Sequence, residues 1–223
     1  MSFDWRDIVL ASKEAIRLRG RFVVALSGGS SMVSFGRALC ELSCGIEWDK
    51  WHFFFADERC VPLSDHRSNY YLAKRELFDI VGVENANIHA VDDSLDPHAA
   101  ATDYQAQIEF FFDTQTPQVP VFDLVVLGIG TDGHTASLFP NSKLLEEKQR
   151  LVAEELHSPK PPSERVTFTL PLINAAGNIL FIATGESKRD IIKKITTTKT
   201  PDKSTPATMI KPKDGALNWL LNQ

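Results

Sequence analysis

Apolar residues along this chain follow two alternating spacings. Continuous apolar runs are typical of buried strands, whereas apolar residues at every third or fourth position are typical of helices. The first pattern predicts strands over residues 21–27, 51–56, 121–127 and 178–184. The second predicts helices over residues 5–19, 31–42, 67–81, 96–112 and 186–195. This alternation indicates an α/β fold, a three-layer sandwich around a mostly parallel, Rossmann-like sheet.

Weaker patterns occur between these segments. They predict strands over residues 87–91 and 151–154, a short helix over 143–150, and a strand over 166–170 with one side in water. Residues 158–163, Ser-Pro-Lys-Pro-Pro-Ser, are expected to form a stiff, exposed loop. Residues 196–205 are expected to form a flexible link, and Trp219 in the tail 216–221 is expected to pack against the protein. The length of 223 residues suits one domain, which we expect to span residues 1–223.

The most informative segment follows the predicted strand 121–127. That strand runs directly into a glycine-rich turn that contains Asp132 and His134. Open α/β sheets bind ligands at the carboxyl ends of their strands, and histidine serves as both acid and base near neutral pH. A lone histidine is more often structural, but Asp132 is close enough in sequence to orient the His134 ring or to bind a substrate hydroxyl. We therefore predict that His134 and Asp132 belong to an active site.

The same turn matches the G-x-G-x-x-G fingerprint of dinucleotide-binding proteins. The glycines are Gly128, Gly130 and Gly133, and Glu154 follows about 20 residues later, where a ribose-binding acid would lie. The fingerprint requires a helix that begins at the turn, so that its N-terminus meets the pyrophosphate. Pro140 would stop such a helix about two turns after Gly133. The sequence therefore disfavours a nicotinamide cofactor.

Three further clusters lie where predicted strands end or helices begin. Residues 27–31, Ser-Gly-Gly-Ser-Ser, would allow backbone N–H groups to approach an anion. No Lys-Ser or Lys-Thr follows, so a phosphate on a small molecule is favoured over a nucleotide, with a tight turn ended by serine caps as the alternative. Residues 57–59, Asp-Glu-Arg, follow an apolar strand, and Lys188 and Arg189 lie in a first helical turn, where an anion would offset their conflict with the helix dipole. Solvated surface charges are the alternative for both.

Arg165 differs from these clusters because it precedes the predicted strand 166–170. It reaches the same edge of the sheet as the other clusters only if this strand runs antiparallel to its neighbours. We therefore predict an antiparallel strand here.

Composition and charge exclude several classes of protein. The formal net charge of −5 argues against nucleic-acid binding, which requires a basic face. No apolar run is long enough to cross a membrane, and residues 1–7 do not resemble a signal peptide. Cys40, Cys44 and Cys60 contain no C-x-x-C pair; a metal site at Cys40 and Cys44 is conceivable, but buried, reduced thiols are favoured. We therefore expect a cytoplasmic protein without a membrane or nucleic-acid partner and without a metal.

Taken in their order along the chain, the clusters of site residues resemble those of the 6-phosphogluconolactonases, in the glucosamine-6-phosphate isomerase/6-phosphogluconolactonase family. The resemblance extends over nearly the whole chain and rests on residues 26–30, 56–59, 68–70, 122–124, 133–135, 139–140, 159–162, 165–167 and 183–188. The related glucosamine-6-phosphate deaminases typically carry an aromatic residue at the position of Arg59 and a different segment after His134. They are similar to this chain at Asp57, Asp132, His134, Arg165 and Lys188. Residues 138–140, Leu-Phe-Pro, therefore favour the lactonases.

The resemblance implies a fold related to that of the deaminases and the hydrolysis of 6-phospho-D-glucono-1,5-lactone in the oxidative pentose phosphate pathway. It implies His134 as the general base that activates water, with Asp132 beside it. The residues expected to bind substrate are Ser27, Gly28, Gly29, Ser30, Asp57, Arg59, Gly130, Arg165 and Lys188. Among them, Ser30, the amides of Gly28 and Gly29, Arg165 and Lys188 would hold the phosphate. The backbone amides of residues 130–133 or Arg59 would stabilise the oxyanion.

A lactone is already electrophilic, so no metal or organic cofactor is expected, and we expect a monomer. Two alternatives stay open. One is an isomerase or deaminase of an amino-sugar phosphate that uses Asp57 as its base. The other is a non-catalytic sugar-phosphate-binding protein.

Overall fold

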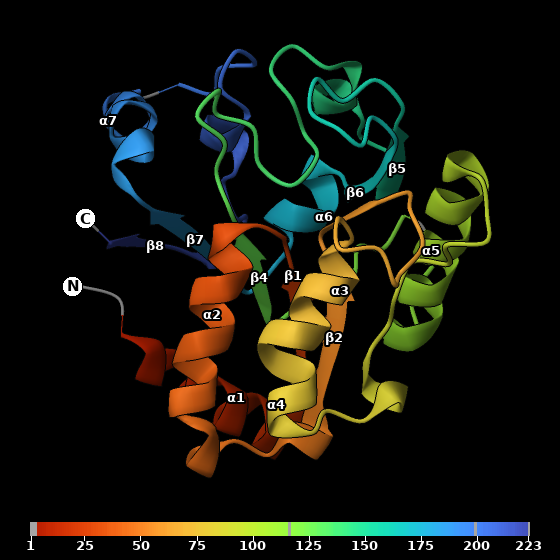
Figure 1. Ribbon diagram of the computed structural model, residues 1–223, viewed down its shortest axis with the longest axis vertical. Helices are drawn as coiled ribbons and strands as arrows, with labels where there is room; N and C mark the ends of the chain where they lie inside the picture. Colours follow the sequence, from red (N-terminus) through yellow and green to blue (C-terminus); the bar gives the residue numbers. More distant parts are fainter. Residues whose placement is uncertain (1–3, 116, 199, 223) are drawn as a thin grey trace.

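The computed structural model describes residues 4–115, 117–198 and 200–222 (Figure 1). Residues 1–3, in the segment expected not to be a signal peptide, and residue 199, in the expected link, lie outside the described residues. The strands are β1 (Phe22–Leu26), β2 (Trp51–Phe55), β3 (Asp57–Arg59), β4 (Leu124–Leu127), β5 (Val152–Glu155), β6 (Arg165–Phe168), β7 (Asn178–Thr184) and β8 (Ala216–Asn222). The α-helices are α1 (Trp5–Arg19), α2 (Ser30–Glu41), α3 (Asn69–Ala73), α4 (Asp79–Val81), α5 (Pro97–Phe112), α6 (Leu170–Asn174) and α7 (Arg189–Thr197). A π-helical segment, η3 (Lys74–Phe78), joins α3 to α4, and 3₁₀ turns lie at η1 (Ser43–Gly45), η2 (Trp48–Lys50), η4 (Asn85–Asn87), η5 (Lys143–Glu146), η6 (Glu186–Lys188) and η7 (Pro206–Met209).

The central sheet has five parallel strands in the order β2-β1-β4-β7-β8. Its inner strands are apolar on both sides because each side is covered. On β1, for example, Val23 and Ala25 belong to one core cluster and Val24 and Leu26 to the other. The expected three-layer α/β sandwich with a mostly parallel sheet is confirmed.

Different elements cover the two faces of the sheet (Figure 1). Helices α1, α2 and the α3–α4 segment pack on one face through residues such as Ile8, Phe35 and Leu77. Helix α5 and a second, smaller sheet pack on the other face, where Tyr104 and Phe168 are fully buried. One outer layer of the sandwich is therefore part helix and part sheet.

The second sheet has three antiparallel strands in the order β3-β6-β5. The antiparallel direction predicted for the strand after Arg165 is confirmed, and its neighbours belong to this separate sheet. Arg165 pairs in register with Arg59 across β3 and β6. The prediction that this strand has one side in water was wrong, because Thr167 is buried and its Oγ1 accepts a hydrogen bond from the Ser137 N–H at 3.2 Å.

Local sequence accounts for the ends of two long helices. Asp4 caps α1 by accepting from the backbone N–H of Arg6, and α1 ends at Gly20 in a left-handed conformation, with φ of 74°. Asp96 caps α5, and Pro97 occupies its first turn. These helices have the bounds that the sequence predicts, to within one residue.

Several segments with weak sequence patterns have structures that differ from those expected. Residues 87–91 form no strand, only a single bridge between Phe53 and Ile88, and the helix predicted over 143–150 is the shorter 3₁₀ turn η5. The expected link 196–205 begins within α7 and ends at Thr205, which is buried. The tail 216–221 is strand β8, since Trp219 stacks on Phe181 at 4.3 Å between ring centroids and β8 pairs in parallel with β7.

The strand order places a topological switch point between β1 and β4. The chain proceeds from β1 to β2 on one side, and β4, β7 and β8 lie on the other. A crevice opens outside the carboxyl ends of the strands at such a point.

Among the described residues, each helix is too short or too polar to span a membrane.

Candidate active site

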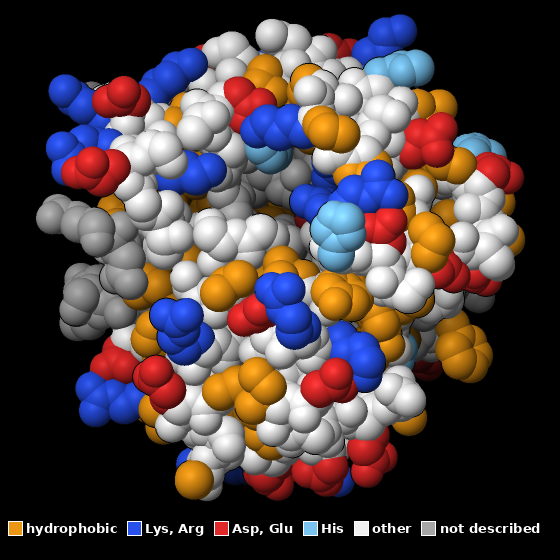
Figure 2. All heavy atoms as spheres, viewed as in Figure 1, with side chains coloured by type: hydrophobic (Ala, Val, Ile, Leu, Met, Phe, Trp, Pro, Cys, Tyr) orange, Lys and Arg blue, Asp and Glu red, His pale blue; other side chains and the backbone are white. Residues whose placement is uncertain are grey.

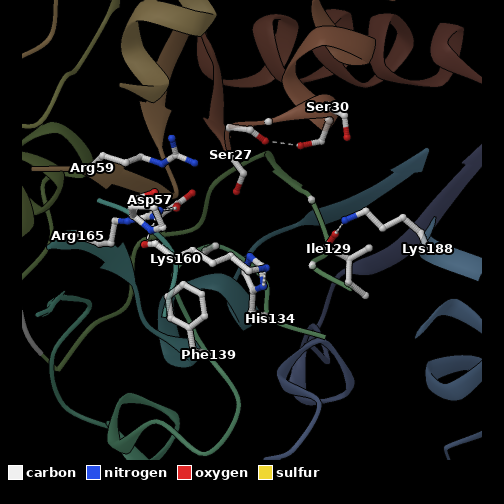
Figure 3. Close-up of a pocket in the computed structure, with 17 residues that line it drawn as sticks. Ser27, Ser30, Asp57, Arg59, Ile129, His134, Phe139, Lys160, Arg165 and Lys188 are labelled. Carbon is white, nitrogen blue, oxygen red and sulfur yellow. Dashed lines mark hydrogen bonds and ion pairs between the residues drawn. The ribbon is translucent and has the colours of Figure 1, made fainter. Parts of the chain in front are cut away.

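A pocket lies at this switch point. Its walls come from the turn after β1, the turn after β4, the β3–β6 pair, the loop before β6 and η6 (Figure 3). Figure 2 shows Lys and Arg side chains around a hollow on this face of the molecule. The lining residues are Ser27, Gly28, Gly29, Ser30, Ser31, Asp57, Arg59, Gly128, Ile129, Gly130, His134, Ala136, Phe139, Lys160, Pro161, Arg165 and Lys188. Every residue expected from the sequence to bind substrate therefore lines one pocket together with His134.

The turn after β4 holds His134 in place through its own backbone. The Gly130 N–H donates to the His134 carbonyl and the Gly133 N–H donates to the Gly130 carbonyl, each at 2.9 Å. A Cβ atom on Gly130 would lie 1.9 Å from Nδ1 of His134 and 2.3 Å from Oδ1 of Asp132. Only glycine allows the imidazole and the carboxylate to approach this backbone so closely.

Asp132 binds the Nδ1 side of the His134 ring. The Nδ1 atom lies 2.5 Å from Oδ1 of Asp132, so the carboxylate accepts the Nδ1 proton. The neutral ring then carries its lone pair on Nε2. Phe139 packs against the ring at 4.8 Å between centroids.

Burial makes His134 a weak base. It lowers the pKa of His134, and the charge of Lys160 acts in the same direction, whereas Asp132 and Asp57 oppose the shift. Burial would raise the pKa of Asp132, but the hydrogen bonds from His134 and the charge of Lys160 act in the opposite direction, and the net effect lowers that pKa. The pair therefore rests as a carboxylate beside a neutral imidazole.

Lys160 is a site residue to which the sequence assigned no role. Its Nζ lies 3.2 Å from Nδ1 of His134 and 3.4 Å from Oδ1 of Asp132. The prediction of an exposed loop is confirmed only in part: Pro159, Pro161 and Ser163 are exposed, but Ser158 is buried and Lys160 reaches the pocket. The antiparallel direction of β6 carried the missed signal, since the loop that precedes Arg165 must lie at the same edge of the sheet.

Arg165 is buried, with 4% of its surface exposed, and its guanidinium holds this loop. Its Nε donates to the carbonyl of Pro162 at 2.7 Å, and its Nη2 donates to the carbonyl of Lys160 at 3.1 Å. Its Nη1 lies 3.9 Å from Oδ2 of Asp57. Arg165 thus ties the Lys160 loop to β3 as well as lining the pocket.

Asp57 is buried and held on both carboxylate oxygens. Ser137 donates to Oδ2 at 2.8 Å, and the side chain of Asn69 donates to Oδ1 at 3.3 Å. Its neighbour Glu58 turns away from the pocket and accepts from the N–H groups of Asn69 and Tyr70 at the start of α3, at 2.7 and 2.8 Å. Burial raises the pKa of Glu58 to about 7, against the effect of these hydrogen bonds.

Arg59 lines the pocket from the same strand as Asp57. Its Nη1 donates to the carbonyl of Arg67 at 2.5 Å. Among the described residues, its buried Nε has no hydrogen-bond partner. The guanidinium of Arg59 therefore has a donor that no described protein group uses.

The turn after β1 has the geometry expected of an anion site. Gly29 has φ of 74°, which favours glycine, and α2 begins at the next residue. The first N–H groups of a helix have no partner within the helix and attract anions. Ser27 is buried, and its Oγ lacks a hydrogen-bond partner among the described residues.

Lys188 lies on the side of the pocket formed by the turn after β4. Its Nζ donates to the carbonyl of Ile129 at 2.5 Å, and burial together with the charge of Lys160 lowers its pKa. Its sequence neighbour Arg189 is exposed and lies 3.5 Å from Glu186. Of the two cations expected in this helical turn, only Lys188 therefore lines the pocket.

The cations enclose the pocket from two sides. Figure 3 shows Arg59 and Arg165 on one side of His134 and Lys188 on the other. The sequence groups Arg165 and Lys188 around one phosphate, whereas the structure separates them across the pocket. Joint binding by these two residues stays a prediction.

Two features of the sequence find no support in this geometry. No helix begins at the Gly128–Gly133 fingerprint, because residues 131–142 form turns and the next helical turn is η5. Of the backbone amides of residues 130–133, those of Gly130 and Gly133 donate within the turn and are not available to an oxyanion. Within the described residues, no group of three His, Cys, Asp or Glu side chains could hold a metal ion.

Known proteins are similar to this chain in sequence and in fold. A family model described as glucosamine-6-phosphate isomerases/6-phosphogluconolactonase matches residues 5–219. The chain is 42% identical to a probable 6-phosphogluconolactonase 1 from Oryza sativa subsp. japonica, over 95% of this chain and 75% of that protein. It is 40% identical to a 6-phosphogluconolactonase from Rattus norvegicus, over 92% of this chain and 79% of that protein. The crystal structure of a 6-phosphogluconolactonase from Thermotoga maritima matches with a TM-score of 0.82 and 30% identity, over 98% of this chain and 93% of that chain.

Proposed function

This chain belongs to the glucosamine-6-phosphate isomerase/6-phosphogluconolactonase family, and from that premise we propose that it is an enzyme that hydrolyses 6-phospho-D-glucono-1,5-lactone to 6-phosphogluconate. That reaction is a step of the oxidative pentose phosphate pathway. One observation carries the proposal: a neutral imidazole, oriented by a carboxylate, lies in the same pocket as an anion site and several cations.

The phosphate of the substrate binds at the turn after β1. The N–H groups of Gly28 and Gly29 and the hydroxyl of Ser30 donate to its oxygens, and Lys188 adds a positive charge. Arg165 contributes charge from the opposite wall. The phosphate in turn stabilises the charged form of Lys188, whose pKa is lowered by burial and by the charge of Lys160.

His134 is the general base. Its Nδ1 proton is held by Asp132, so Nε2 accepts a proton from water as the water oxygen attacks C1 of the lactone. The C1 carbonyl becomes a tetrahedral oxyanion. The imidazolium then returns the proton to the ring oxygen as the bond between C1 and that oxygen breaks, which leaves His134 neutral again.

Arg59 stabilises the oxyanion. The other candidates from the sequence are the backbone amides of residues 130–133, and two of them, those of Gly130 and Gly133, donate within their own turn. Arg59 lines the pocket and has a buried Nε without a partner among the described residues. A positive group preorganised at this position lowers the barrier without rearrangement during the reaction.

The contacts of Asp57 disfavour the deaminase alternative. A base at C2 of an amino sugar needs an accessible carboxylate, whereas Asp57 is 5% exposed and receives hydrogen bonds on both oxygens. These contacts support a structural role for Asp57 at the pocket wall.

A substrate comparison tests the proposal. Freshly prepared 6-phosphogluconolactone is given to the protein at neutral pH, and 6-phosphogluconate formation is followed after subtraction of spontaneous ring opening. A second reaction measures ammonia released from glucosamine 6-phosphate. Lactone hydrolysis without ammonia release supports the proposal. Ammonia release without lactone hydrolysis would replace it with the deaminase, and binding without either reaction would indicate a sugar-phosphate-binding protein.

A further inference from the structure

The ammonium group of Lys160 faces the Asp132 side of His134. We infer that Lys160 is a positioning residue of the proposed hydrolysis: it fixes the Asp132–His134 pair in one protonation arrangement and opposes the addition of a second proton to the ring. The inference rests on the proposed function, and it concerns a residue that acts through the Asp132–His134 pair.

The distances define which atoms Lys160 contacts. Its Nζ is 3.4 Å from Oδ1 of Asp132 and 3.2 Å from Nδ1 of His134. The Nδ1 proton is already donated to Asp132 over 2.5 Å, so Nδ1 has no lone pair to accept from an ammonium. Oδ1 of Asp132 therefore accepts from both groups, and the proximity of Nζ to Nδ1 is a close approach of two donors.

The contacts of Lys160 lie on the Nδ1 side of the His134 ring. Proton transfer takes place at Nε2, on the opposite side of the ring from Nδ1. The positive charge of Lys160 beside Nδ1 repels the ring once the ring becomes an imidazolium. The imidazolium formed during the reaction is thereby a stronger acid, which favours return of the proton to the leaving ring oxygen.

Arg165 holds the backbone that carries Lys160. The guanidinium donates to the Lys160 carbonyl at 3.1 Å and to the Pro162 carbonyl at 2.7 Å, and it is buried. A lysine side chain alone is flexible, but here its backbone is fixed from a neighbouring strand. The loop thus presents Lys160 to the Asp132–His134 pair, although its side chain remains 43% exposed.

The other charged groups around His134 do not replace Lys160. Asp132, on the same turn, and Asp57, on β3, are acidic and favour the imidazolium. Lys188, on η6, is a cation whose own pKa is lowered by the charge of Lys160 and raised by that of Asp132, and its Nζ is held at the carbonyl of Ile129. Lys160 is therefore the cation closest to the ring among the contacts described here.

Titration of His134 by NMR tests the inference without using activity. The ring signal of His134 is assigned by its absence in His134→Asn, and its pKa is measured in the wild type, Lys160→Met and Lys160→Arg. Removing the charge in Lys160→Met is expected to raise the His134 pKa by on the order of one unit. Lys160→Arg keeps the charge and is expected to keep the wild-type value.

Lys50→Met is a matched control. The Lys50 side chain is 46% exposed and lies 3.1 Å from Asp49, so it has a similar exposure and a carboxylate partner. It lies before β2, at the end of the sheet opposite the pocket. Its removal is expected to leave the His134 pKa unchanged.

Kinetics provide a second readout. The acid limb of kcat/KM against pH is expected to move to higher pH in Lys160→Met by the same amount as the His134 pKa. An unchanged His134 pKa in Lys160→Met would overturn the inference, as would a raised KM at every pH without a shift of the limb, which is the result expected of a substrate contact. If the wild type hydrolysed no lactone, the proposed function would fail, while the NMR titration would still decide the role of Lys160.

Discussion

The hydroxyl of Ser137 donates a 2.8 Å hydrogen bond to Oδ2 of Asp57, across 80 positions of sequence. Both side chains are buried, Ser137 completely. The bond joins the segment after the His134 turn to strand β3 of the second sheet, and Arg165 reaches the same carboxylate oxygen at 3.9 Å. The relative position of the His134 turn and the wall that carries Arg59 and Arg165 therefore depends on this contact.

Replacing Ser137 with alanine is expected to destabilise the protein. A buried carboxylate oxygen would lose its donor, which costs roughly 1–3 kcal/mol in the free energy of unfolding. Denaturation in urea measures the change. Ser163→Ala is the control, because Ser163 is exposed; equal stabilities of the two variants would show that the bond contributes nothing.

Replacing His134 with asparagine is expected to lower kcat for lactone hydrolysis by about 10²–10⁴-fold, because general-base help is lost. Affinity for 6-phosphogluconate, measured by calorimetry, should stay within a few-fold because the anion site is untouched. An active His134→Asn enzyme would show that another group activates the water.

The pH dependence of kcat/KM should follow His134 on the acid side. The neutral ring is the active form, and burial lowers its pKa from the ordinary value of 6.5. Activity should therefore be constant through neutral pH and fall only as pH drops through the lowered pKa. The rate is measured from about pH 5 to 8, a range that extends at least about one unit to either side of the pKa of an ordinary histidine. An inflection above 6.5 would contradict this assignment.

Replacing Gly130 with alanine is expected to displace the catalytic ring while the protein remains folded. The new Cβ would lie 1.9 Å from Nδ1 of His134, and a misplacement of about 1 Å can cost on the order of 10²-fold in rate. Gly45→Ala is the control, since its Cβ would lie 3.8 Å from the nearest atom, Nζ of Lys13. Kinetics and circular dichroism of both variants separate loss of geometry from loss of fold.

Replacing Lys188 with alanine is expected to raise KM for the phosphorylated lactone by roughly 10- to 100-fold, the value of a hydrogen bond to a charged group. The KM for unphosphorylated gluconolactone should change little. Arg189→Ala, at the exposed neighbouring position, should behave as the wild type. The same rise with both substrates would indicate that Lys188 does not bind the phosphate.

Prediction from sequence succeeded where a local pattern determines structure. Strand β7 has the predicted bounds, and α5 follows the Asp96-Pro97 cap. It failed where a segment takes its structure from a distant partner. Strand β8 forms because Trp219 stacks on Phe181 and because the edge of β7 is available, and neither condition is visible in the tail itself.

The candidate site shows the same division. Glycines beside an aspartate and a histidine mark the turn at His134, and the antiparallel direction of β6 followed from the place of Arg165 alone. Lys160 was missed because prolines and polar residues suggest an exposed loop. Its approach to Asp132 depends on the buried guanidinium of Arg165, which binds that loop from another strand.

The order of residues by itself determined the strands and helices with strong apolar patterns, where the long helices are capped, and which turn carries Asp132 and His134, because these depend on side-chain spacing and on neighbours within a few positions. Tertiary structure decided which side chains surround that pair. It engaged the amides of Gly130 and Gly133, set Arg59 and Arg165 across from Lys188, and brought Lys160 beside His134. Charges act over distances in space, so their effect on the imidazole is fixed only when the strands have assembled.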